Sequence, residues 1–144
     1  MLQLGQRNSL KDKIQVMNNI FFFIAGISSG MIIFQSAINA PSIFKVFSEK
    51  EAGPFLRIIF PKLFLNVSFL SLFGLILSLF NDSIYKQALF FASLLFMSIC
   101  YLIVPATNNA RDQGKDNIFK RLHFISVILT LLTLLLNFSI FFIS

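Results

Sequence analysis

The chain has very few of the side chains from which disulfides, metal sites and catalytic centres are usually built. Its single cysteine, Cys100, excludes a disulfide within the chain and a metal site built from cysteines. One cysteine and one histidine, His123, are too few for a closed zinc site. The sequence also lacks a phosphate-binding glycine loop and a Ser-His-Asp arrangement with a positioned acid. Because Cys100 lies within an apolar run, we expect it to be a small buried hydrophobic residue.

Charged residues are also scarce, at 12% of the sequence, whereas hydrophobic residues make up 56% and twenty of the 144 residues are phenylalanine. A soluble domain of this length could not hide so much apolar surface, because small domains leave a large share of their surface in water. Hydrocarbon is therefore the predicted solvent. The net charge of +6 comes from basic residues at the ends of apolar runs. This placement favours anionic lipid headgroups over nucleic acid as the partner of that charge.

Four apolar stretches are each close to the roughly 20 residues with which a helix crosses a ~30 Å hydrocarbon core. They cover residues 19–40, 55–80, 84–104 and 122–143. We therefore predict an all-α fold, an integral membrane four-helix bundle formed by a single transmembrane domain over residues 1–144. The polar, basic residues 1–18 carry Leu10, Ile14 and Met17 at spacings of four and three, which predicts a short helix on the membrane surface.

Two prolines mark the expected ends of the first and third spans. Pro41 and Pro105 should stop these helices, because proline cannot extend the helical hydrogen-bond ladder. The segments 41–54 and 105–121 would then be long loops on the same side of the membrane. The loop side carries eight Lys and Arg residues against four on the other side, which places the loops in the cytoplasm and both termini outside. Little alanine and abundant Ile, Phe, Lys and Asn indicate an AT-rich bacterial genome, hence a bacterial inner membrane, with a mitochondrial membrane as the alternative.

Two similar segments lie where the expected loops enter the second and fourth spans. Ile59–Leu65 and Ile118–Phe124 share the pattern Ile-Phe-x-[Lys/Arg]-Leu followed by two large residues. The similarity suggests two repeated helical hairpins of the same orientation, related by a pseudo-twofold axis along the membrane normal. Chance similarity in a chain rich in Phe, Ile and Leu is the alternative.

Candidate ligand-binding residues gather around the second of these segments. His123 is either an interfacial residue bonded to a carbonyl group or a proton carrier or ligand, because imidazole titrates near neutral pH and binds metals. It is the one candidate for a metal ligand, and the identity of any metal or cofactor is unknown. We expect a polar pocket at the long-loop face that contains Gln35, Asn39, Asn109, Arg111, His123 and Ser126. Interhelical hydrogen bonds for Gln35 and Asn39, and solvated loop positions for Asn109 and Arg111, are the alternatives.

An ordered set of short motifs runs through the chain: Ala40-Pro41-x-x-Phe44, Ala52-Gly53, Phe60, Pro105, Asn109, Arg111 and Phe119-x-x-Leu122-His123-x-x-Ser126. Over roughly residues 20–140 this set resembles the transmembrane protein 205-like family of small four-helix membrane proteins. One departure is Phe124, where that group often has a small residue. The resemblance implies an integral membrane protein with proposed links to metal or drug resistance and trafficking, and it implies no established activity.

Three classes of function remain open from the sequence. A non-enzymatic module that binds a small ligand, metal or lipid, or assists transport, fits the expected pocket best. A structural or accessory subunit is the alternative, with Gly26 and Gly30 forming a small-residue face for a membrane-protein partner or a second copy. A membrane oxidoreductase that holds a cofactor through His123 is the third. The lipid bilayer is the expected partner in each case, and nucleic acid is not.

Overall fold

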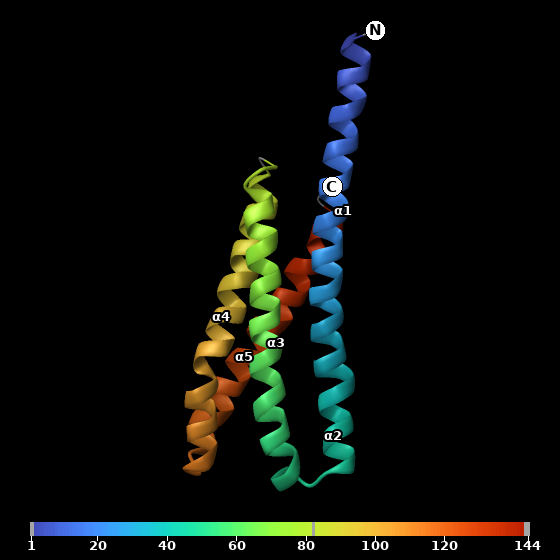
Figure 1. Cartoon of the computed structure of the whole chain (residues 1–144). Helices are drawn as coiled ribbons and strands as arrows, with labels where there is room; N and C mark the ends of the chain where they lie inside the picture. The colour runs from blue at the N-terminus through green and yellow to red at the C-terminus, as the bar shows by residue number, and fades with distance from the viewer. Residues whose placement is uncertain (1, 82, 143–144) are drawn as a thin grey trace.

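Long apolar stretches with few interruptions form helices throughout the computed structural model, which describes residues 2–81 and 83–142. The elements are α1 (Leu2–Ile33), the π-helix η1 (Phe34–Asn39), α2 (Ala40–Val46), α3 (Glu49–Ser78), α4 (Ile84–Asp112), α5 (Asp116–Ser139) and the 3-10 turn η2 (Ile140–Phe142). Figure 1 shows α1, η1 and α2 as one continuous rod beside α3, α4 and α5. The predicted all-α four-helix bundle is confirmed.

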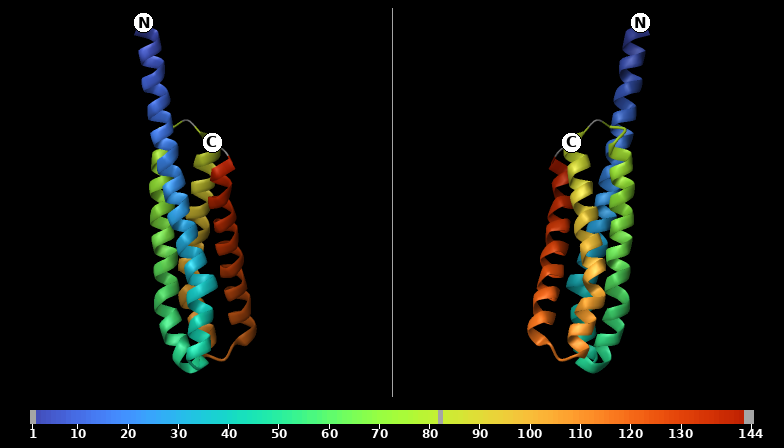
Figure 2. Two further views of the ribbon diagram at one scale, coloured as in Figure 1. Left: turned by 90° about the vertical axis from the view of Figure 1, so that its right-hand side faces the viewer. Right: turned by 90° about the vertical axis from the view of Figure 1, so that its left-hand side faces the viewer.

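Each helix of the bundle packs against its neighbours in chain order, and α5 closes the ring by contacting α1. The contacts of α3 with α4, and of α4 with α5, are more extensive than those made by α1. Figure 2 shows the turn between α2 and α3 and the turn between α4 and α5 at the same end of the molecule, which we call the turn end. The opposite end, toward which α1 rises from the bundle, is the terminal end.

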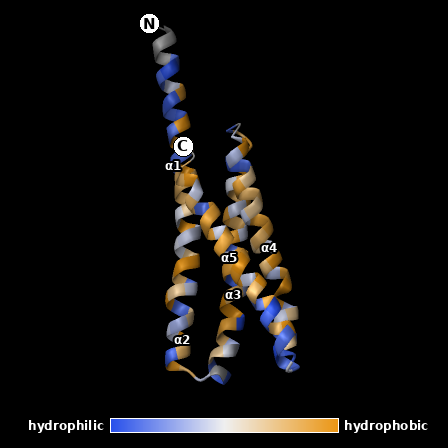
Figure 3. Ribbon diagram, turned by 180° about the vertical axis from the view of Figure 1, so that it is seen from behind, coloured by the Kyte–Doolittle hydropathy of each residue, from blue (hydrophilic) through white to orange (hydrophobic). Residues whose placement is uncertain are grey.

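The outside of the bundle is as apolar as its inside. Phe23, Phe69 and Leu102 expose 68%, 61% and 72% of their surface, and Figure 3 shows hydrophobic residues along all the helices, with polar ones concentrated toward the helix ends. Four helices, within residues 6–46, 50–78, 84–112 and 116–142, are long and apolar enough to cross a membrane. Helices suit this environment because their backbone hydrogen bonds are satisfied internally. The chain is a multi-pass membrane protein.

The expectation that Pro41 ends the first helix is wrong. The chain continues through η1 into α2, where Pro41 stands in the first turn, and the amide of Ala40 bonds the carbonyl of Gln35 five residues back. In a regular α-helix a proline ring meets the carbonyl four residues earlier, and the wider π turn before Pro41 relieves that crowding. Pro105 likewise lies inside α4. The segments 41–54 and 105–121 are therefore mostly helical rather than long loops.

Two local sequence signals at the turn end show where α3 begins and where α4 ends. Ser48 caps α3 in a capping box with Glu51, whose carboxylate accepts bonds from the Ser48 amide at 3.1 Å and hydroxyl at 2.7 Å. Gly114, with φ +66°, ends α4 in a Schellman motif. In this motif the amide of Lys115 donates to the carbonyl of Ala110 at 2.9 Å, and the amide of Gly114 donates to the carbonyl of Arg111 at 3.1 Å.

The structure also differs from the expected surface helix in residues 1–18, and it places the two similar segments differently. Residues 2–18 are not a separate surface helix, because α1 runs without interruption from Leu2 to Ile33 and extends beyond the bundle (Figure 1). The two similar segments occupy different places in their helices. Ile59 lies ten residues after the start of α3 at Glu49, whereas Ile118 lies two residues after the start of α5 at Asp116. The repeated hairpin stays a prediction. The expected end of the fourth span, residue 143, lies outside the described residues.

Candidate functional site

A cleft of about 730 Å³ opens at the turn end between the α1–η1–α2 rod and α5. One wall is formed by Ile32, Ile33, Ser36, Ala37, Ala40, Pro41 and Phe44, and the facing wall by Phe119, His123, Ser126, Val127, Thr130, Leu131 and Leu134. The floor comes from α3, with Gly53, Leu56, Arg57, Phe60, Pro61 and Phe64, and from α4, with Val104, Thr107, Asn108 and Arg111. This volume falls within the range of ~300–1,000 Å³ that is usual for ligand sites.

The cleft exists because α5 diverges from the rod. The substantial contacts between α5 and the rod are made with α1, and none of that extent is made with η1 or α2 among the described residues. Small side chains widen the gap, since Ser36, Ala37, Ala40 and Gly53 all line it. Phe44, Val127 and Leu131 in its walls remain 54%, 48% and 50% exposed. The cleft is therefore accessible from the side of the bundle.

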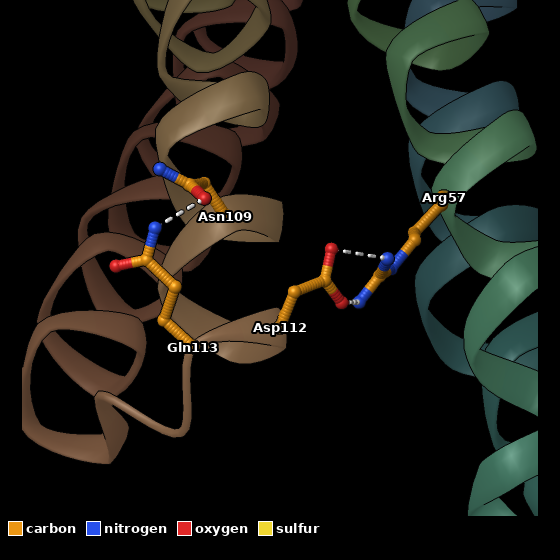
Figure 4. A network of polar contacts seen from close by, with 4 residues as sticks. All are labelled: Arg57, Asn109, Asp112 and Gln113. Atoms are coloured by element: carbon orange, nitrogen blue, oxygen red, sulfur yellow. Dashed lines mark hydrogen bonds and ion pairs between the residues drawn. The ribbon is translucent and has the colours of Figure 1, made fainter.

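Charge is confined to one end of the cleft and has one sign. Arg57 and Arg111 are the Lys or Arg residues that line the cleft, and no Asp or Glu lines it among the residues whose side chains the structure describes. Arg57 of α3 donates two hydrogen bonds to Asp112 of α4, from Nη2 to Oδ1 at 2.6 Å and from Nη1 to Oδ2 at 3.1 Å (Figure 4). The pair is exposed, with 35% and 59% of the two side chains accessible. The pair fixes the direction of Arg57, and Asp112 balances part of its charge from outside the cleft lining.

Arg111 and His123 are held by the same aromatic ring. The guanidinium of Arg111 lies over the ring of Phe119 at 4.7 Å from its centroid. The imidazole of His123 lies nearly parallel to that ring, with centroids 5.8 Å apart and an angle of 9° between the planes. Phe119 and His123 are four residues apart on α5 and so share a face. The result is a layered arrangement of cation, phenyl ring and imidazole that joins the end of α4 to the start of α5.

The hydroxyl groups on the α5 wall have their hydrogens engaged within the helix. Ser126 donates to the carbonyl of Leu122 at 3.2 Å, and Thr130 donates to that of Ser126 at 2.7 Å. Their oxygen lone pairs remain as acceptors beside an otherwise apolar surface. Cys100 is buried, as predicted, and its sulfur lies 3.7 Å from the same Ser126 carbonyl. These contacts pack α4 against α5 below the cleft.

The structure brings three of the six predicted site residues together and places the others elsewhere. Arg111, His123 and Ser126 line the cleft. Gln35 is buried and accepts a 2.8 Å hydrogen bond from Asn39 within the rod, and neither residue lines the cleft. The physical reason is η1, in which Ser36 and Ala37 rather than Gln35 face α5.

Asn109 also lies outside the cleft. Its side chain accepts a 2.8 Å hydrogen bond from Gln113 on the exposed side of α4 (Figure 4). α4 remains helical through this region, and residues two apart do not share a helical face. Asn109 and Arg111 therefore point in different directions.

Sequence reasoning missed the contribution of α3. Gly53, Arg57, Phe60 and Phe64 line the floor of the cleft at spacings of four, three and four, which is one face of a helix. Arg57, Phe60 and Phe64 lie within the predicted span 55–80, but the expected pocket contained no residue of that span. Among the described residues, no group of three or more His, Cys, Asp or Glu side chains is arranged to hold a metal ion.

Comparison with known proteins gives one match. The profile of a family described as a domain of unknown function (DUF4149) matches residues 23–115, which is more than half of the chain and covers the rod from residue 23 onward, α3 and α4. No curated protein and no solved structure matches.

Proposed function

The chain belongs to the DUF4149 family of unknown function, and we propose that it is a non-enzymatic membrane protein that binds an anionic phospholipid in the cleft between the rod and α5. One acyl chain lies along the apolar walls, and the headgroup contacts Arg57 and Arg111 beside His123. The observation that carries the proposal is the charge pattern of the cleft, whose lining is apolar over most of its length and includes Arg57 and Arg111 but, among the residues whose side chains the structure describes, no Asp or Glu.

The position of the cleft favours a lipid over a water-soluble ligand. Its opening lies on the side of the bundle, among exposed residues such as Val127 and Leu131 that suit hydrocarbon. An acyl chain gains little free energy by moving from the bilayer into such a cleft, because lipid tails are as apolar as leucine. Discrimination must then come from the headgroup, and each basic side chain near an anionic headgroup contributes about 1 kcal/mol.

The finer assignments are part of the same proposal. Eight basic residues flank the turn end in the sequence and four flank the terminal end, which supports a cytoplasmic turn end in a bacterial inner membrane. Kinship with the transmembrane protein 205-like family is supported by the gathering of its motif residues at one place. Nine of them line the cleft: Ala40, Pro41, Phe44, Gly53, Phe60, Arg111, Phe119, His123 and Ser126.

A tryptophan reporter tests the proposal, because the chain has no tryptophan of its own. Phe60→Trp places one in the floor of the cleft, and Phe69→Trp, at an exposed position of the same helix, is the matched control. Each variant is reconstituted in phosphatidylcholine bilayers containing increasing amounts of brominated phosphatidylglycerol or brominated phosphatidylcholine. Bromine quenches indole fluorescence only at short range, so quenching reports which lipid occupies the cleft.

We expect the Phe60→Trp signal to saturate at a lower fraction of the anionic lipid than of the zwitterionic one, whereas Phe69→Trp follows bulk composition for both. Adding Arg111→Gln to Phe60→Trp should weaken the preference about fivefold, the equivalent of ~1 kcal/mol. Equal quenching by both lipids at Phe60→Trp would show that the headgroup is not recognised. No quenching at this position would show that lipid does not enter the cleft.

A second candidate function, that of a structural or accessory subunit, rests on the exposed face of α1 that carries Gly26 and Gly30. Gly26 and Gly30 are exposed, and a Cβ built on either one would meet no atom within 4 Å. An open small-residue face permits close approach of a helix from a partner or a second copy. Gly26→Leu and Gly30→Leu should then abolish co-purification of that subunit, and unchanged assembly in both variants would remove this candidate.

A further inference from the structure

Polar side chains lie in the middle of the bundle, between two separate apolar clusters. One cluster, toward the turn end, includes Ile32, Val67 and Met97. The other, toward the terminal end, includes Phe21, Phe90 and Ile140. The level between them contains Ser28 and Ser29 of α1, Ser68 and Ser71 of α3, and Thr133 and Asn137 of α5, all of them buried. We call these six residues the polar layer.

Ring contacts between the helices place these residues within about two helical turns of one another along the bundle. Phe22 stacks on Phe141 with centroids 5.3 Å apart, which sets the register of α1 against α5. At about 1.5 Å per residue, Asn137 lies roughly 6 Å from Phe141 toward the turn end. Ser28 lies roughly 9 Å from Phe22 in the same direction. Asn137 and Ser28 are therefore separated by less than one helical turn in height.

The register of α3 follows from a second set of contacts. The ring of Phe90 lies against Phe21, with centroids 5.7 Å apart, and directly against the backbone of Gly74. Phe21 and Gly74 are thus level with each other. Ser71 and Ser68 then lie about 4.5 Å and 9 Å closer to the turn end, on the same rise per residue. Ser28 lies about 10.5 Å from Phe21 in the same direction, so Ser68 is nearly level with Ser28 and Ser71 lies about 6 Å from it toward the terminal end.

Five atoms of the polar layer have no hydrogen-bond partner within the chain. They are the hydroxyl oxygens of Ser28, Ser29, Ser68 and Ser71 and the amide nitrogen Nδ2 of Asn137. At most 9% of any of these residues is accessible. A buried donor or acceptor without a partner costs about 1–3 kcal/mol. Five of them together would cost about as much as the whole stability of a typical domain, ~5–15 kcal/mol.

We propose that the polar layer is an internal hydration site, in which water molecules bridge α1, α3 and α5. Water accepts from Asn137 Nδ2 and both donates to and accepts from the serine hydroxyls, so one kind of guest satisfies every orphaned atom. A metal cation would meet the amide nitrogen as a repelling donor, and no carboxylate lies within the layer to balance its charge. Buried water typically occurs about once per 27 residues, or roughly five molecules in a chain of this length. The proposal is independent of what fills the cleft.

Water-edited solid-state NMR of the unaltered chain in bilayers tests this directly, because it measures how fast magnetisation passes from water protons to each carbon. The chain has three threonines and five valines, so selective labelling of these types gives separable signals. Thr133 reports on the polar layer, and Val67, fully buried in the adjacent apolar cluster, is the dry control. Val46, 75% exposed, gives the rate for full contact with water.

We expect the Thr133 signal to build up several times faster than that of Val67 and to approach that of Val46. Asn137→Leu should slow it, whereas Asn109→Leu, an exposed position outside the layer, should leave it unchanged. Equal build-up of Thr133 and Val67 in the unaltered chain would overturn the proposal. The serine hydroxyls would then have to rotate and donate to carbonyls of their own helices, as Thr133 does to Leu129 at 2.9 Å.

Discussion

Arg57 and Asp112 stand 55 positions apart in the sequence and meet at the turn end in a two-pronged ion pair between α3 and α4. The same guanidinium lines the cleft, and the carboxylate does not. Asp112 and an anionic headgroup are thus alternative partners for one cation. The pair connects the stability of the turn end to the electrostatics of the proposed lipid site.

The first prediction concerns this competition. Asp112→Asn should increase the preference of the cleft for anionic lipid, by up to about fivefold, because Arg57 is released to the headgroup. The measurement is the brominated-lipid quenching of Phe60→Trp. Asp116→Asn is the control, since it removes the same charge from the same end without altering the Arg57 pair. A reduced preference in Asp112→Asn, or equal changes in both variants, would contradict competition for Arg57.

Filling the cleft should exclude the lipid without changing any charge. Ala37 lines the wall formed by the rod, so Ala37→Leu adds bulk where an acyl chain would lie. We expect the saturable quenching of Phe60→Trp to disappear. Ala106→Leu, an exposed position of α4 that does not line the cleft, should leave it intact. Persistent saturable quenching in Ala37→Leu would place the lipid elsewhere.

The prolines and glycines of the turn end show which features of the fold could be predicted from the sequence. Hydropathy was sufficient for four helices, because the length of an apolar run is set by the thickness of the bilayer. The prediction that Pro41 and Pro105 end their helices was wrong, because a proline in a membrane helix is tolerated where neighbouring turns adjust. The signals that operate are the capping box of Ser48 and Glu51, which begins α3, and Gly114, which ends α4.

The candidate site was half predictable for a related reason. Arg111, His123 and Ser126 converge because α4 and α5 are joined by a short turn, whereas the sequence had indicated a long loop that carries Arg111 beside His123. Arg57 could not be assigned, since its partner Asp112 is distant in the chain and depends on the register of α3 against α4. Gln35 was misplaced because the π-helix changes the angular position of residues 34–39, and no simple periodicity announces it.

Gly114 provides a stability prediction at the turn between α4 and α5. Its φ of +66° is a left-handed conformation that costs other residues free energy. Gly114→Ala should lower the free energy of unfolding by about 1 kcal/mol, measured by reversible unfolding in mixed detergent micelles. Gly114→Asn should cost less, because asparagine tolerates this conformation better. Equal losses in both variants would indicate that contacts rather than backbone conformation decide the effect.

Gly74 is required for a different reason, the close approach of α3 and α4. A Cβ added there would overlap the ring of Phe90. Gly74→Ala should destabilise the bundle by about 1–3 kcal/mol, the usual cost of overpacking a core. Gly26→Ala, where a Cβ meets no atom within 4 Å, should be neutral or stabilising because alanine favours the helix. Phe90→Leu in the Gly74→Ala background should recover part of the loss, and a lack of recovery would argue against the overlap.

The last prediction concerns the terminal end, where Lys86 is buried to 5% accessibility at the start of α4. Its ammonium donates a 2.6 Å hydrogen bond to Asn18 Oδ1 and lies 5.1 Å from the centroid of the Phe21 ring. Replacing the buried ammonium of Lys86 by an apolar group should cost little, because no buried charge then remains. Replacing only its partner Asn18 leaves the ammonium buried without this hydrogen bond. Asn18→Leu should therefore destabilise the bundle by about 1–3 kcal/mol.

Lys86→Met is the matched variant, because methionine keeps the length of the side chain and loses the charge. It should cost clearly less than Asn18→Leu, and the double variant should resemble Lys86→Met alone, since the asparagine then has no ammonium to satisfy. Thermal unfolding of the three variants in the same detergent measures the difference. If Lys86→Met were the more damaging change, the ammonium would contribute through its position over Phe21 rather than through Asn18.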